Sequence, residues 1–99
     1  MVISLDPEEI LARIFGSVSR ARILEFLLSH SDKAFYQREI MYETGQRLQP
    51  TQRELKNLCE LGIIKKRKTR SRVYYEIDTH SPFFKHLAEI IRVISNPKQ

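Results

Sequence analysis

The order of apolar and polar residues predicts two amphipathic helices in the first third of the chain. Apolar residues recur at helical spacing from Ile10 to Phe15 and again from Ile23 to Leu28. Asp6-Pro7 precedes the first run, and this pair favours a helix start because aspartate caps the N-terminus and proline fits the first helical position. Gly16 suits the end of that helix, and Ser17 or Ser19 suits the start of the next.

Two shorter helical patterns follow, with Gly45 between them. The first runs from Arg38 to Thr44, and the second begins at Leu48 or Gln49 and ends before Gly62. The second has an inward face of four residues at helical spacing, namely Thr51, Leu55, Leu58 and Cys59. Its opposite face is polar and consists of Gln49, Gln52, Arg53, Lys56 and Asn57.

Alternating residues then predict an antiparallel hairpin with strands over 63–67 and 72–77. The connection Lys68-Thr69-Arg70-Ser71 has neither Gly nor Asn, so we expect a loop longer than two residues. Ala34-Phe35-Tyr36 is short, and we interpret it as a small strand beside the hairpin.

The last helix, expected over about residues 82–95 after Ser81-Pro82, has more apolar positions than one buried face requires. One side can pack on its own chain, and the other is left without cover. A second copy of the chain is the simplest way to cover it, so we expect a homodimer.

The positive charge is concentrated in one segment. The chain has 99 residues, which suits a single domain over 1–99, and a net charge of +5 from 17 basic and 12 acidic residues. Six cations and no acid lie between Gly62 and Arg72, so the other residues hold 11 cations and 12 acids, a net charge of −1. A cationic patch on a near-neutral body predicts a polyanion partner, although a solvated hairpin has the same composition.

Composition also bears on the cellular compartment. Cys59 is the only cysteine, which excludes an internal disulfide and suits a reducing cytoplasm. No apolar run approaches the roughly 18 residues of a membrane span, and no signal peptide is evident. We therefore expect a cytoplasmic protein without a membrane partner.

Residues 10–93 resemble winged helix-turn-helix regulators of the ArsR-like superfamily. Four segments in this order carry the resemblance: FGSVSRARILEFLL, YQREIMYETG, QRELKNLCELGII and RVYYEID…SPFFKHL. Small prokaryotic, often archaeal, regulators are the most similar members. The resemblance implies a mainly α fold with the order helix, helix, short strand, helix, helix, two strands, helix. It also implies a recognition helix over 49–61, a basic wing over 65–72, and dimerisation through the terminal helices, about 7–15 and 82–95.

The resemblance implies sequence-specific binding to double-stranded DNA and regulation of transcription. The expected base contacts are Gln49 and Gln52, whose amides suit adenine, and Arg53, whose guanidinium suits guanine. An ion pair with Glu54 or Glu60 is the alternative role for Arg53. The expected contacts to the DNA backbone are Gln37, Arg38, Arg47, Lys56, Lys65, Lys66, Arg67, Lys68, Arg70 and Arg72. The expected dimer interface consists of Ile10, Leu11, Ile14, Phe84, Leu87, Ile91 and Ile94.

Neither a metal nor another cofactor is predicted. Metal-sensing relatives carry a D-x-H…H-x-x-E pattern in the last helix, whereas here Asp78 and His80 precede Pro82, and only His86 and Glu89 fall in the helix. We expect Asp78 to cap a loop, His86 and Glu89 to pair on the helix surface, and Cys59 to fill the core. A metal or small-molecule effector is not expected, although the sequence does not exclude one.

An enzymatic role is not expected either. Gly16-Ser17 resembles the start of a nucleotidyltransferase motif, but Asp32 provides one carboxylate where that chemistry needs a pair. We interpret Ser17 as a helix cap. The principal alternative to regulation is a winged-helix protein-interaction module that binds nucleic acid only non-specifically. The sequence does not indicate an operator, a regulated gene, or repression as opposed to activation.

Overall fold

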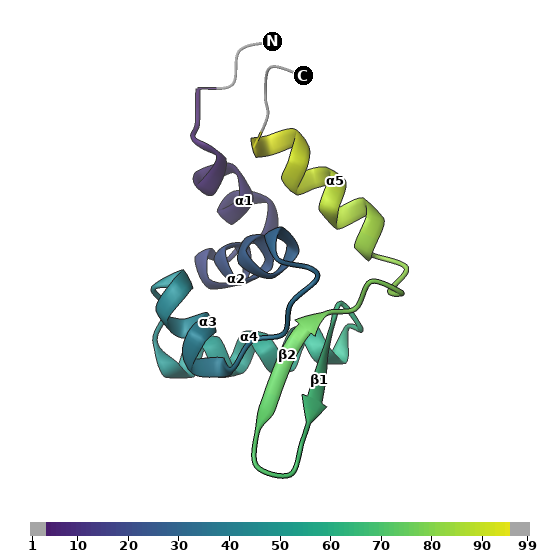
Figure 1. Ribbon diagram of the computed structural model, residues 1–99. Coiled ribbons are helices and arrows are strands. Elements are labelled where there is room, and N and C mark those ends of the chain that lie inside the picture. Colours follow the sequence, from purple (N-terminus) through teal and green to yellow (C-terminus); the bar gives the residue numbers. More distant parts are fainter. Residues whose placement is uncertain (1–3, 96–99) are drawn as a thin grey trace.

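The computed structural model describes residues 4–95, and within them the chain is mainly helical with a small antiparallel hairpin (Figure 1). The ends of the predicted domain, residues 1–3 and 96–99, lie outside the described residues. The elements follow in the order α1 (Pro7–Phe15), α2 (Val18–Ser29), α3 (Gln37–Thr44), α4 (Leu48–Glu60), β1 (Ile64–Lys68), β2 (Val73–Ile77) and α5 (Phe84–Ser95).

Short-range capping bonds explain why the first two helices begin where the sequence predicts. The Asp6 carboxylate accepts the Glu9 N–H at 2.9 Å, and the Ser17 hydroxyl accepts the Arg20 N–H at 3.0 Å. Gly16 ends α1 with a φ of 69°, a conformation that side chains with a Cβ rarely adopt. The prediction of Ser17 as a helix cap is therefore confirmed.

The last helix begins two residues later than the sequence predicts. Residues 81–83 form a turn in which the Ser81 hydroxyl accepts the Phe83 N–H at 3.2 Å. The Ser81 carbonyl accepts the Phe84 N–H at 3.1 Å. Pro82 therefore lies in this turn, and α5 starts at Phe84.

The predicted antiparallel hairpin is confirmed, with each strand starting one residue later than expected, but the third strand is not confirmed. Ile64 pairs with Ile77, Lys66 with Tyr75 and Lys68 with Val73, which leaves a connection of residues 69–72. Phe35 forms an isolated bridge with Tyr75 through N–H to O bonds of 2.9 and 2.8 Å. The pairing cannot extend into a strand because α3 begins at Gln37, only two residues later.

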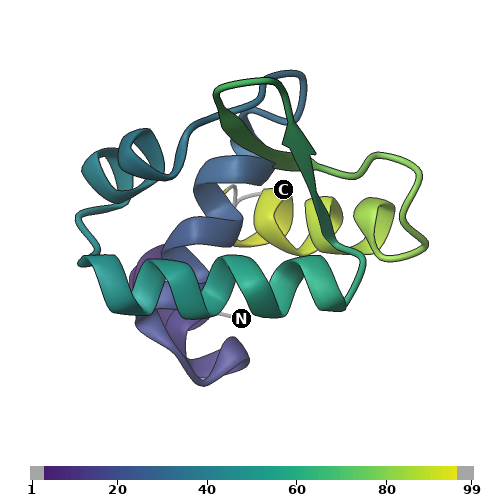
Figure 2. The same cartoon turned by 90° about the horizontal axis from the view of Figure 1, so that it is seen from below.

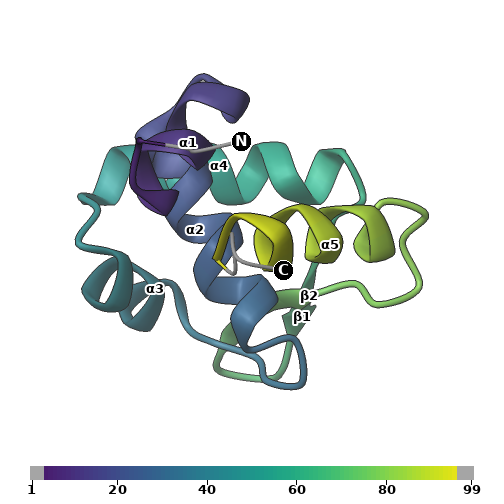
Figure 3. The ribbon, with the colours of Figure 1, turned by 90° about the horizontal axis from the view of Figure 1, so that it is seen from above.

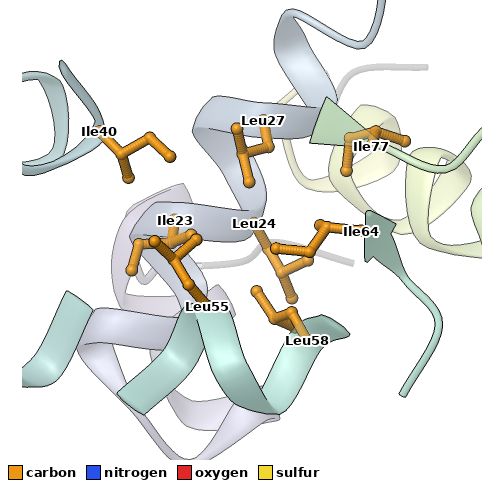
Figure 4. Close-up of a cluster of buried hydrophobic side chains, with 8 residues drawn as sticks. All are labelled: Ile23, Leu24, Leu27, Ile40, Leu55, Leu58, Ile64 and Ile77. Carbon is orange, nitrogen blue, oxygen red and sulfur yellow. The ribbon is translucent and has the colours of Figure 1, made fainter. Parts of the chain in front are cut away.

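Helix α2 lies at the centre of the fold and contributes to two hydrophobic clusters. In the larger cluster its Ile23, Leu24 and Leu27 pack with residues of α3, α4 and both strands (Figure 4), namely Ile40, Leu55, Leu58, Ile64 and Ile77. In the smaller cluster Ala21 packs with Leu11 of α1 and Ile91 of α5. One helix thus joins the terminal helices to the α3–α4–hairpin half of the chain.

The smaller cluster corrects the predicted dimer interface. Leu11 is 1% exposed and Ile91 is 9% exposed, so both are buried against their own chain and the prediction is wrong for these two residues. Ile14 is exposed, whereas Ile10, Phe84, Leu87 and Ile94 are partly buried. Four further apolar residues near the chain ends are exposed and were not among those predicted, namely Val18, Phe83, Ile90 and Val93.

A partly buried ion pair joins α2 to α4. The Arg20 guanidinium donates to both carboxylate oxygens of Glu54, at 2.8 and 3.2 Å, and to the carbonyl of Phe15 at the end of α1, at 3.1 Å. The Glu54 side chain is only 4% exposed, whereas that of Arg20 is 34% exposed. Glu54 therefore points inward, and the alternative in which it pairs with Arg53 is wrong.

We expect Arg20→Ala to lower the free energy of unfolding by about 2–4 kcal/mol, because it leaves a buried carboxylate without its partner. Urea unfolding followed by circular dichroism measures this change. The matched control is Arg13→Ala, which removes an exposed arginine that lies 3.7 Å from Glu9 and is expected to cost at most about 0.5 kcal/mol. Equal losses for the two variants would contradict the structural role of Arg20.

Candidate nucleic-acid interface

The inward side chains of α4 determine which of its residues face outward. Thr51, Leu55 and Leu58 are at most 1% exposed, so the helix packs along this side. Because successive helical residues are turned by about 100°, the opposite side faces solvent. Four polar residues are exposed on that side, namely Gln49, Gln52, Arg53 and Lys56. Arg53 forms no ion pair among residues 4–95.

The residues before and within the α3–α4 turn add cations to the same part of the molecule. Gly45 ends α3 with a φ of 66°, and Arg47 precedes the first residue of α4. Arg47 is exposed, as is Arg38 in the first turn of α3, whereas Gln37 is partly buried. These positions agree with the outward orientation expected from the sequence.

A shallow groove of about 370 Å³ joins α3, α4 and the hairpin. Its polar lining consists of Gln37 from α3, Gln52, Lys56 and Glu60 from α4, and Lys66 from β1. Leu55, Cys59 and Tyr75 complete its wall. In the view from below, α3, α4 and the hairpin lie on the near side of the molecule (Figure 2). The structure thus brings together side chains that are up to 38 positions apart in the sequence, from Gln37 to Tyr75.

The six hairpin cations fall into chemically different groups, a difference that the sequence analysis missed. Lys65 lies opposite Glu76 in the hairpin, with its amine 3.6 Å from the carboxylate, and Arg67 lies 3.2 Å from the same carboxylate. Glu76 therefore neutralises part of the charge of these two residues. Lys66, Lys68 and Arg70 are exposed and have no ion pair within the described part of the chain.

Arg72 has phenolic partners in place of a carboxylate. The rings of Tyr36 and Tyr74 stack with centroids 4.7 Å apart, and their hydroxyls are 3.0 Å apart. The Arg72 guanidinium donates to the Tyr36 hydroxyl.

These contacts shift the pKa of the two tyrosines in opposite directions. Hydrogen bonds with Tyr74 and Arg72 lower the pKa of Tyr36. The hydrogen bond to Tyr36 is the main cause that raises the pKa of Tyr74. Neither tyrosine was a candidate site residue, since nothing local in the sequence indicates their contact.

Of the residues considered for metal binding, Asp78 has the role predicted for it, but the predicted pairing of His86 with Glu89 is not observed, since no hydrogen bond or ion pair joins them within residues 4–95. The Asp78 carboxylate accepts the His80 N–H at 2.9 Å, which confirms the predicted loop cap. No group of three or more His, Cys, Asp or Glu side chains suited to a metal ion forms within residues 4–95. Over the same residues, every helix is too short or too polar to cross a membrane.

Cys59 and Tyr75 are partly buried where α4 meets the hairpin. Burial raises the pKa of the Cys59 thiol, an effect that the positive charge of Lys66 opposes. Burial also raises the pKa of the Tyr75 phenol. Cys59 packs against the larger hydrophobic cluster, as expected for a cysteine on the inward side of α4.

Comparisons of the whole chain with known proteins find no match to a protein-family model, a curated protein or a solved structure.

Because its pKa is raised, the Cys59 thiol has a smaller thiolate fraction near pH 8 than an exposed cysteine, and the thiolate is the reactive form. We expect it to react more slowly with a disulfide reagent in the folded protein than in the chain unfolded in urea. Absorbance of the released thiol measures both rates. Equal rates would contradict the placement of Cys59 between α4 and the hairpin.

Proposed function

We propose that this chain is a winged helix-turn-helix regulator of transcription that binds double-stranded DNA sequence-specifically as a homodimer, without catalysing a reaction. The observation that carries the proposal is the groove that joins the outward side of α4 to the first turn of α3 and to the hairpin. A helix with directed hydrogen-bonding groups beside a cationic hairpin suits a major groove and its flanking phosphates.

In this proposal α4 is the recognition helix. It has 13 residues and is therefore about 20 Å long, and the major groove, about 12 Å wide, admits a helix. Gln49, Gln52 and Arg53 lie in its N-terminal half, the part that contacts base edges first in helix-turn-helix proteins. Amides can pair with adenine and a guanidinium with guanine, so this helix can distinguish base pairs.

The remaining polar residues position the protein on the DNA backbone. Gln37, Arg38 and Arg47 lie at or near the N-termini of α3 and α4, and Lys56 lies one turn beyond Arg53. The hairpin serves as the wing. Lys66, Lys68 and Arg70 are its principal phosphate contacts because they have no ion pair among residues 4–95. Lys65 and Arg67 contribute less, since Glu76 already partly neutralises them.

The terminal helices support a dimer in which both copies present this interface. Ile14 and Val18 are 56% and 50% exposed, and Val93 is 56% exposed. In the view from above, α1, α2 and α5 lie in front of α4 and the hairpin (Figure 3), so a partner on the terminal helices leaves α4 free. A twofold dimer predicts a roughly palindromic operator with half-sites about 34 Å apart.

A protein-interaction module is the alternative function. The hairpin cations would then contact an acidic partner, and DNA affinity would depend on salt but hardly on sequence. The ratio of specific to non-specific affinity separates the two functions better than affinity alone, because a basic hairpin binds any DNA at low salt.

Selection of bound duplexes from a random DNA pool tests the proposal. We expect a palindromic motif, protected in footprinting over two half-sites. A pool that keeps a flat sequence profile after several rounds would favour the interaction module.

We expect Arg53→Ala to weaken binding to the selected motif by about 1–3 kcal/mol and to relax preference at one base position in each half-site. Competition binding against duplexes with each base at that position measures both effects. Arg13→Ala is the matched control, because it removes the same charge from an exposed position on α1. If the two variants lose the same affinity at every sequence, Arg53 does not contact a base.

We expect Glu76→Gln to strengthen binding to all duplexes, because it removes the carboxylate that partly neutralises Lys65 and Arg67. The slope of log K against log salt should become steeper by up to about 0.9 for each of these cations that then contacts a phosphate. Titrations at several salt concentrations measure this slope. Glu9→Gln removes the same charge from α1 and serves as the control. An unchanged slope for Glu76→Gln would show that Lys65 and Arg67 do not reach phosphates.

A further inference from the structure

The hairpin and the start of α3 meet at a cluster of side chains around Arg72. Tyr36 lies immediately before α3, Tyr74 lies on β2, and their stacked rings join these elements. The Arg72 guanidinium carbon lies 5.3 Å from the centre of the Tyr36 ring, while its N–H bonds to the hydroxyl of that ring. The cluster thus holds Arg72 in one place although the connection 69–72 is exposed.

The partners of Arg72 leave its positive charge uncompensated. A neutral phenol accepts a hydrogen bond from a guanidinium without cancelling its charge, whereas a carboxylate cancels most of it. Arg67, on the neighbouring strand, has the carboxylate partner Glu76. The nearest acid in the first turn of α3 is Glu39, and its carboxylate accepts the Tyr36 backbone N–H at 2.9 Å. Arg72 is therefore an oriented cation with charge available for an anion.

A groove of about 390 Å³ opens beside this guanidinium. Its lining consists of Tyr36, Arg38, Ser71, Arg72 and Val73, so two arginines and a serine share one groove. Arg38 is exposed and has no ion pair within the described residues. Arginine guanidinium groups and serine hydroxyls are groups that proteins use to bind phosphate oxygens.

We infer that this groove is a binding site for one phosphodiester group, with Arg72 and Arg38 as ligands and Tyr36 as the residue that positions Arg72. The inference rests on the proposed function, since it assigns the phosphodiester to the backbone of bound DNA. It adds a defined contact that joins the connection at the tip of the wing to the start of α3. Among residues 4–95, three other hairpin cations have no ion pair or aromatic contact, namely Lys66, Lys68 and Arg70. Lys65 and Arg67 lie beside Glu76, and the Arg67 guanidinium carbon is 5.9 Å from the centre of the Tyr74 ring.

Salt-dependent titrations with a short duplex test the site. Arg72→Ala is expected to reduce the slope of log K against log salt by about 0.9, the value for one lost phosphate contact. Arg67→Ala is the matched control, and its reduction is expected to be smaller because Glu76 shares its charge. Equal reductions for Arg72→Ala and Arg67→Ala would overturn the distinction between the two arginines.

Tyr36→Phe separates positioning from charge. This variant keeps the ring stack and the arginine but removes the hydroxyl. We expect the slope of log K against log salt to remain unchanged and the affinity to fall about 2–10-fold, the effect of one lost hydrogen bond. Arg72→Lys keeps the charge without the planar guanidinium, and it is expected to keep the slope with weaker binding. Full affinity in Tyr36→Phe would overturn the positioning role of Tyr36, and full affinity in Arg72→Lys would overturn the role of the guanidinium.

Nuclear magnetic resonance of the tyrosine rings provides a direct readout. We expect the Tyr36 and Tyr74 signals to shift when duplex is added to the native protein and to shift less in Arg72→Ala. A contrary outcome is a complex in which the tyrosine signals stay unshifted while the sequence preference still depends on Arg53. That result would overturn the phosphodiester site and leave the proposed function intact. A native protein with no sequence preference would instead overturn the proposed function.

Discussion

The orientation of α4 depends on the ion pair between Arg20 and Glu54. Arg20 links three elements, because it binds Glu54 of α4 and the last carbonyl of α1 while it belongs to α2. Glu54 is buried, and a buried carboxylate is tolerated only where a cation and hydrogen bonds compensate it. The pair therefore reinforces the orientation that the buried side chains of α4 establish, in which Gln52, Arg53 and Lys56 face outward.

The partners of the cations, more than their number, distinguish the parts of the hairpin. Glu76 holds Lys65 and Arg67, two tyrosines hold Arg72, and Lys66 and Lys68 extend from the opposite side of the ribbon. Side chains at alternate positions of a strand point to opposite faces, so a single run of basic residues is divided by the pleat. The net charge of the segment overstates the charge that one ligand would meet.

The proposed function combines two kinds of contact with different physical origins. The hairpin cations attract any polyanion, and this attraction weakens as salt rises. The amides and the guanidinium of α4 form directed bonds, whose strength depends on the base pair that they meet. The groove at Lys66 and Gln52 brings both kinds of group together, which is why sequence preference is the property that distinguishes a regulator from an interaction module.

The sequence by itself determined the features that depend on neighbouring residues. Asp6 and Ser17 cap helices through bonds to residues three positions on, and the outward face of α4 follows from its periodicity. Contacts between distant residues were decided only by the tertiary structure. Glu54 meets Arg20 across 34 positions, Tyr74 meets Tyr36 across 38, and Leu11 and Ile91 meet in one cluster. The spacing of apolar residues predicts which side chains face inward. Which residues they contact there depends on how whole helices and strands pack, and this the local sequence does not specify.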